Sequence, residues 1–206
     1  MNLPNDISLY LPKYLSDEST KVLLEALQEF PSNINQKFYT AHFSDTDVIF
    51  QGDGMKGFQV INLPSERIDI APVLVLSNTC DIDLKNKRDF PSQISYAPLL
   101  NLNKYKTMLE ANGKSAVSVE DHLADVRKQK ITQMLYLPMG SGLTYEAIVF
   151  LDRINNCDNK SISRKDLYQR RLFVLSDYGF YLFLIKVSFH FTRIQEKIDR
   201  NKGVIL

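Results

Sequence analysis

The sequence predicts a mixed α+β fold, in which short strands lie between an N-terminal and a C-terminal helix. Short apolar runs bounded by polar turns, of which 72–77 is the clearest, are typical of β-strands. Residues 17–30 and 176–200 instead repeat apolar side chains every three or four positions, as amphipathic helices do. With 206 residues, 44% of them hydrophobic, the chain is long enough for one domain with its own core.

The N-terminal residues 1–47 are predicted to form a helical extension of the domain. Ser16 is a suitable N-cap for a helix over 17–30, and Pro31 ends that helix. The apolar stripe of this helix consists of Val22, Leu23, Ala26, Leu27 and Phe30. Because the first residues lack the basic start and apolar core of a signal peptide, we expect a cytoplasmic protein.

Residues 48–206 contain the predicted strands. These are 48–50, 58–63, 72–77, 94–100, 135–137, 147–154 and 172–175, with a turn at 51–54 and a polar loop at 64–69. A helical insertion over 102–133 interrupts them, with one helix at 104–111 and a second at 119–131, capped by Ser118. Ser176 begins the last helix, which is expected to reach Arg200 with a core-facing stripe of Phe180, Leu184, Val187, Phe191, Ile194 and Ile198.

The composition excludes several classes of protein. The chain has 25 basic and 24 acidic residues, so it is not a globally basic nucleic-acid wrapper, and only a local basic loop is compatible with that role. Cys80 and Cys157 fit neither a disulfide framework nor a zinc site, and Cys157 is predicted to lie in a turn. No window reaches the roughly 18 apolar residues of a membrane span, so no membrane partner is expected.

The candidate functional site is the junction between strand 72–77 and the loop that follows it. Functional residues are common at such junctions, because the strand is rigid and the loop is open. The junction carries Asn78, Thr79, Cys80 and Asp81, followed by Lys85, Lys87 and Arg88. The basic side chains suit phosphate contacts, but short charge runs are also common in solvated loops, and both interpretations stay open.

Cys80 has two interpretations. It can serve as a thiolate nucleophile, provided that a base lies beside it. The histidines His42, His122 and His190 are not at spacings that indicate partnership, so a structural cysteine is the favoured interpretation.

The aspartates of the same loop also have two interpretations. Asp81 and Asp83 can hold a divalent cation together with Asp89 or Asp152. The favoured interpretation is an Asx-type turn, in which an aspartate oxygen accepts backbone N–H groups just after the strand.

Several segments follow one another in an informative order. They are Gln51-Gly52-Asp53, PVLVLSN at 72–78, YAPLL at 96–100, YLP at 136–138, AIVFLDRINNCD at 147–158 and RRLFVLSD at 170–177. In this order they resemble the PemK/MazF toxin family over residues 50–193, with the insertion left out. The resemblance implies a small, mostly antiparallel β-barrel with a C-terminal helix, and a toxin-like or defence-associated bacterial protein.

The resemblance further implies a metal-independent endoribonuclease. Members of the family cleave single-stranded RNA without a metal or cofactor, act as homodimers, and are inhibited by an antitoxin, so we expect RNA, a second copy, and an antitoxin or other protein partner. Some relatives of the same fold instead poison DNA gyrase, so the fold alone does not determine the activity.

The family also indicates where the reacting residues lie. Its members place an arginine directly before the strand equivalent to 72–77, where this chain has Ala71, and a serine or threonine near the position of Ser92. The resulting candidates are Arg88, Ser92, Cys80 and Asp81 for catalysis, and Arg67, Lys85, Lys87, Asn78 and Thr79 for substrate binding. Two alternatives stay open: a catalytically inactive barrel that serves as a protein- or nucleic-acid-binding module, and a cysteine-dependent enzyme.

Overall fold

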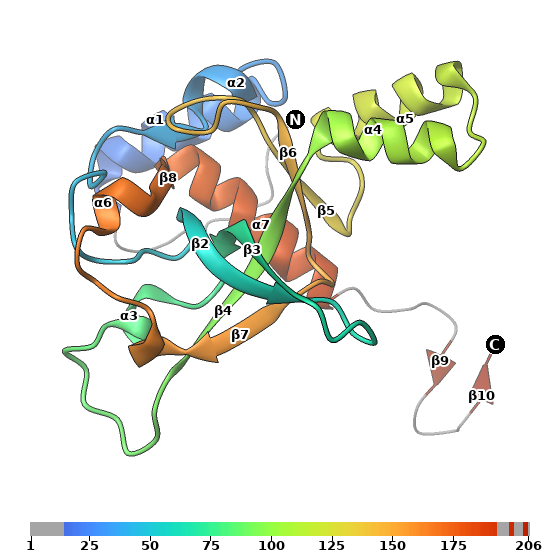
Figure 1. Cartoon of the computed structure of the whole chain (residues 1–206). Helices are drawn as coiled ribbons and strands as arrows, with labels where there is room; N and C mark the ends of the chain where they lie inside the picture. Colours follow the sequence, from blue (N-terminus) through green and yellow to red (C-terminus); the bar gives the residue numbers. More distant parts are fainter. Residues whose placement is uncertain (1–14, 193–197, 200–203, 206) are drawn as a thin grey trace.

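The computed structural model describes residues 15–192, 198–199 and 204–205, and its main feature is an eight-stranded, antiparallel sheet (Figure 1). The strands of this sheet are β1 (Tyr39–Thr40), β2 (Gly54–Ile61), β3 (Ile68–Val75), β4 (Gln93–Asn101), β5 (Met134–Leu137), β6 (Ala147–Phe150), β7 (Asn155–Asp158) and β8 (Arg171–Leu175). The helices are α1 (Asp17–Gln28), α2 (Ile34–Lys37), α3 (Thr79–Ile82), α4 (Leu102–Ala111), α5 (Ala116–Arg127), α6 (Leu167–Arg170) and α7 (Asp177–Thr192). A separate pair is formed by β9 (Ile198–Asp199) and β10 (Val204–Ile205).

The sheet curls into a barrel-like shape that strand pairing does not close. Its order is β1-β8-β2-β3-β4-β6-β5, and β7 pairs with β4 beside β6. The curl brings β7 close to β2, where the Ile61 N–H donates to Asn155 Oδ1 at 2.8 Å. The Tyr96 hydroxyl of β4 likewise donates to the Gln59 carbonyl of β2 at 2.6 Å. The predicted mixed fold with a mostly antiparallel, barrel-like sheet is therefore confirmed.

Two hydrophobic cores lie on the two faces of the curled sheet. Neighbouring residues of a strand point to opposite faces, so β3 sends Val73 and Val75 into one core and Leu74 into the other. The core inside the curl also holds Phe58 and Tyr96, whose rings meet edge to face at 4.8 Å. The larger core lies between the sheet and the helices.

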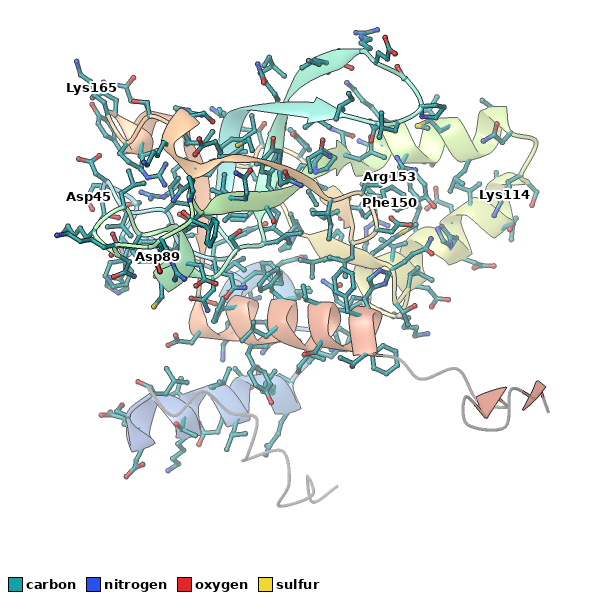
Figure 2. The ribbon with its side chains drawn as sticks, turned by 90° about the horizontal axis from the view of Figure 1, so that it is seen from below. Asp45, Asp89, Lys114, Phe150, Arg153 and Lys165 are labelled. Atoms are coloured by element: carbon teal, nitrogen blue, oxygen red, sulfur yellow. The ribbon has the colours of Figure 1, made fainter. Side chains whose placement is uncertain are left out.

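Helix α7 lies between the sheet and α1 (Figure 2). Ser176 caps it as predicted, because its Oγ accepts the Gly179 N–H at 3.1 Å. The predicted stripe is only partly right: Phe180, Leu184 and Val187 are half-buried, whereas Phe191 is exposed. Helix α7 is covered on two sides, so it buries a broader set: Tyr178, Gly179, Tyr181, Leu182, Phe183 and Lys186. The described helix ends at Thr192; Ile198 belongs to β9, and Ile194 lies outside the described residues.

The N-terminal segment contributes to the same core. Ser16 caps α1 as predicted, its Oγ accepting the Ser19 N–H at 3.1 Å, although Val22 of the predicted stripe is 58% exposed. Phe38 is fully buried and β1 pairs with β8. The division of the chain at residue 47 stays a prediction.

The β2–β3 hairpin is longer than the sequence indicates. Its strands begin at Gly54 and Ile68, whereas the prediction placed a turn over 51–54 and a loop over 64–69. The predicted strand 48–50 is wrong, because the Val48 carbonyl accepts from the Arg171 guanidinium instead of a neighbouring strand.

Three later predictions also need correction. Helix α5 begins at Ala116, and its cap is Ser115, whose Oγ accepts the Ser118 N–H at 3.3 Å. The predicted strand 147–154 is interrupted by a turn after Phe150. Cys157 lies within β7, paired with Ile94, and not in a turn.

Helices α4 and α5 form a hairpin that projects from the sheet (Figure 1). In the described part of the chain, none of the helices combines the length and hydrophobicity that crossing a bilayer requires.

Candidate functional site

The predicted site begins where β3 ends and the short helix α3 starts. Asn78 caps α3, because its Oδ1 accepts the Cys80 N–H at 2.9 Å. Thr79 Oγ1 accepts the Gln51 N–H at 3.0 Å. Both side chains, which were predicted to bind substrate, are thus occupied with holding the backbone.

Arg88 folds back onto α3. Its Nη2 lies 2.6 Å from Asp81 Oδ1, in an ion pair whose side chains are 44% and 61% exposed. The Cys80 carbonyl accepts from Arg88 Nη2 at 3.4 Å and from Asn86 Nδ2 at 2.7 Å. The structure therefore brings together three of the predicted catalytic residues, but the charge of Arg88 is compensated by Asp81.

The base of the loop is held by a residue that the sequence did not indicate. Asn159, which is 1% exposed, donates from Nδ2 to the Ile82 carbonyl at 2.9 Å and to Ser92 Oγ at 2.8 Å. Arg164 donates in turn to Asn159 Oδ1 and, at 3.3 Å, to the Ile82 carbonyl. These contacts join segments some 70 residues apart in the chain, for which a single sequence carries no signal.

The loop over 83–91 carries an exposed aromatic ring a few residues after its lysines. Phe90 is 84% exposed and Leu84 is 51% exposed. Lys85 and Lys87 are also exposed, and neither forms an ion pair within the residues that the structure describes. The loop lies at one end of the molecule, where Figure 2 places Asp89 far from Lys114 of the insertion. Phe90 was missed, although an aromatic residue in a charged loop is itself a sequence signal.

Arg67 does not belong to this site. It precedes the first residue of β3, whereas the loop follows the last, and eight residues of strand span roughly 25 Å. Its guanidinium pairs with Asp69 at 2.8 Å instead. The structure therefore places Arg67 away from the loop, and its role in substrate binding stays a prediction.

The chemistry of the site is limited by what surrounds its hydroxyl and thiol. His122 bonds to the Tyr105 hydroxyl at 3.0 Å, and no histidine in the described residues hydrogen-bonds to Cys80 or Ser92. Asp83 Oδ1 accepts the Lys85 N–H at 2.9 Å, which confirms the Asx-type turn for this aspartate. Nor do the described residues form a cluster of three or more His, Cys, Asp or Glu side chains suited to a metal ion. Within the described residues, the arrangement places no histidine base beside the candidate nucleophiles Cys80 and Ser92.

Comparison of the chain with models of known protein families gives no match, and no curated protein matches it either.

Proposed function

We propose that this chain binds single-stranded RNA through the loop over residues 83–91. The observation that carries the proposal is Phe90, whose ring is 84% exposed in a loop that also presents Lys85 and Lys87. An exposed ring gives an unpaired base a stacking surface worth about 1–3 kcal/mol, whatever the sequence. Neighbouring lysines supply the phosphate contacts that such binding also needs.

The contacts of the loop support this division of roles. Arg88 is held by Asp81, so we assign the phosphate contacts to Lys85 and Lys87. The brace formed by Asn159 and Ser92 fixes the base of the loop, which lowers the entropy lost when a ligand binds.

The test measures binding of a fluorescein-labelled RNA of about 20 nucleotides by fluorescence anisotropy. We expect Phe90→Ala to weaken binding about tenfold, the loss of roughly one stacked base. Lys87→Ala should lower the slope of log K against log salt by about 0.7, the value for one lost contact to a single strand. Phe189→Ala and Lys114→Ala, exposed residues on α7 and in the insertion, are the matched controls. Unchanged binding by Phe90→Ala would contradict the proposal.

Cleavage of the RNA is the second candidate. It is supported by Arg88, which lies in the same loop, by Ser92, which directly follows the loop, and by the PemK/MazF resemblance of the sequence. A homodimer and an antitoxin partner, which that resemblance implies, also remain proposals. The RNA should be incubated with the protein and a chelator, and the product ends mapped. Discrete cuts with cyclic phosphate ends, absent with Arg88→Ala and Ser92→Ala, would establish a metal-independent ribonuclease. If the RNA binds but stays intact, the protein is a binding module and not a nuclease.

A further inference from the structure

One side of strand β3 is open over residues 68–71. The strand pairs with β2 along most of its length, but it pairs with β4 only through Val73–Val75. Beyond that point β4 continues with β6, and no described strand pairs with the outer side of β3.

The hydrogen bonds at the end of β3 show which backbone groups face the open side. The Val75 N–H donates toward β2, to the Asp53 carbonyl at 2.9 Å, and the Leu76 N–H donates toward β4, to Ser95 at 2.8 Å. Backbone groups alternate between the two sides of a strand. The even-numbered residues Ile68 and Ile70 therefore direct their backbone groups to the open side, where no described residue bonds to them.

On the opposite edge of the same hairpin, side chains form hydrogen bonds with outward backbone groups. On β2, the outward Gln59 carbonyl accepts from the Tyr96 hydroxyl, and the outward Ile61 N–H donates to Asn155 Oδ1. Side chains thus satisfy the outer edge of β2 and leave that of β3 unpaired. A strand edge with unpaired N–H and C=O groups is a template for another strand.

The two residues whose backbone faces the open side, Ile68 and Ile70, have apolar side chains. Ile68 and Ile70 are 60% and 67% exposed, and they lie on the face that buries Leu74 further along the strand. The nearby charges of Arg67 and Asp69 pair with each other at 2.8 Å. Proteins often guard an edge with an unpaired lysine, and this edge has none. Glu66, just before β3, is exposed and has no ion pair among the described residues, whereas the edge itself is apolar and therefore complementary to an apolar strand.

We propose that the open edge of β3 binds an extended segment of a partner protein by strand addition. The backbone of the segment pairs with the N–H and C=O groups of Ile68 and Ile70, next to the point where β4 leaves β3. Every second side chain of the segment is apolar and packs against Ile68 and Ile70. This surface lies at the other end of β3 from the loop over 83–91, and the inference does not rest on RNA binding.

The test begins with a displayed library of random peptides of about twelve residues, selected on the full chain. Enriched peptides should alternate apolar residues, and their affinities are measured as synthetic, fluorescein-labelled peptides. Ile70→Pro removes one outward N–H, at an edge position where proline is tolerated. We expect it to weaken binding about tenfold, whereas Ile70→Val, which keeps the N–H, should change it less than about threefold.

A second measurement does not depend on how well the variant folds. The peptide is N-methylated on one alternate set of its amides and then on the other, and both are tested on the unchanged protein. One set should abolish binding and the other should not, because only alternate amides face the edge. Phe189→Ala, on α7, should have no effect. Absence of enriched peptides, or equal effects of both methylated sets, would overturn the proposal. The proposal would also be overturned if the protein sediments as a dimer and Ile70→Pro dissociates that dimer, because the edge would then bind a second copy of the chain.

Discussion

Arg171 and Lys186 are both buried cations of this fold, but different groups surround them. The Arg171 side chain is 2% exposed and pairs with the fully buried Asp53, Nε to Oδ2, at 3.1 Å. Its Nη1 also donates to the carbonyls of Phe43, Ser44 and Thr46, at 3.1, 3.0 and 2.8 Å. Arg171 thus holds the loop before β2 as well as its counter-ion.

Lys186 has no carboxylate partner among the residues that the structure describes. Its residue is 8% exposed, and its Nζ donates to the carbonyls of Gln129 and Ile131, at 2.9 and 2.5 Å. These carbonyls follow the C-terminal end of α5, where partial negative charge favours a cation. Lys186 therefore attaches the helical insertion to α7 through backbone dipoles alone.

The comparison shows two ways of burying a charge, with different consequences for protonation. Burial raises the pKa of Asp53 to about 6, because desolvation outweighs the Phe50 N–H and the Arg171 guanidinium that favour its charged form. Asp53 Oδ1 has no hydrogen-bond partner among the described residues, which removes one contact that would oppose this shift. Burial lowers the pKa of Lys186 to about 8, without an acidic group to offset it.

The largest expected effect comes from breaking the Arg171 cluster. Arg171→Leu leaves Asp53 buried without its partner and deprives the carbonyls of the loop over 43–48 of their donor. We expect the free energy of unfolding, measured with urea, to fall by about 4 kcal/mol. The neighbouring Arg170 also binds carbonyls, those of Lys56 and Gly57, but without a buried counter-charge. Arg170→Leu should cost about 1 kcal/mol or less, and equal losses would refute the distinction.

The second prediction isolates the protonation of Asp53. Its folded pKa, about 6, lies above the reference value of 3.8, so the folded state holds the proton more tightly. The resulting stability is fully present below pH 3.8 and is lost as the pH rises through about 6. Between about pH 4 and pH 7, wild type should lose about 2.5 kcal/mol relative to Asp53→Asn. Parallel stability curves for the two proteins would show that Asp53 does not titrate in this window.

Local signals predicted much of this fold, and long-range contacts account for most of what was missed. Apolar runs gave β4 and β8, and Ser16 and Ser176 gave the starts of their helices, since each signal is contained in a few neighbouring residues. The strand predicted at 48–50 failed because Arg171, more than 120 residues away, takes up the carbonyl of Val48.

In the candidate site, too, neighbouring residues were predicted and long-range contacts were missed. Its members between Asn78 and Ser92 were found because they are contiguous in the sequence, and the structure does bring them together. Asn159 and Arg164 reach the loop only through the pairing of β4 with β7, which a single sequence does not reveal. Arg67 was chosen because it is the nearest arginine before Ala71 in the sequence. In the structure, the length of β3 separates it from the loop.

The smallest expected effect concerns Lys186, whose cation is stabilised by carbonyls alone. Its folded pKa, about 8, lies below the reference value of 10.5, so the unfolded chain holds the proton more tightly between these values. Stability should therefore rise with pH, by about 2 kcal/mol for wild type relative to Lys186→Met between about pH 7.5 and pH 9.5. Lys128→Met, at an exposed position beside the same helix end, should run parallel to wild type. If the stability of Lys186→Met changes with pH in parallel with that of wild type, the pKa of Lys186 is the same in the folded and the unfolded chain. The carbonyls of Gln129 and Ile131 would then replace the hydration of the ammonium group fully, and a buried lysine would need no counter-ion here.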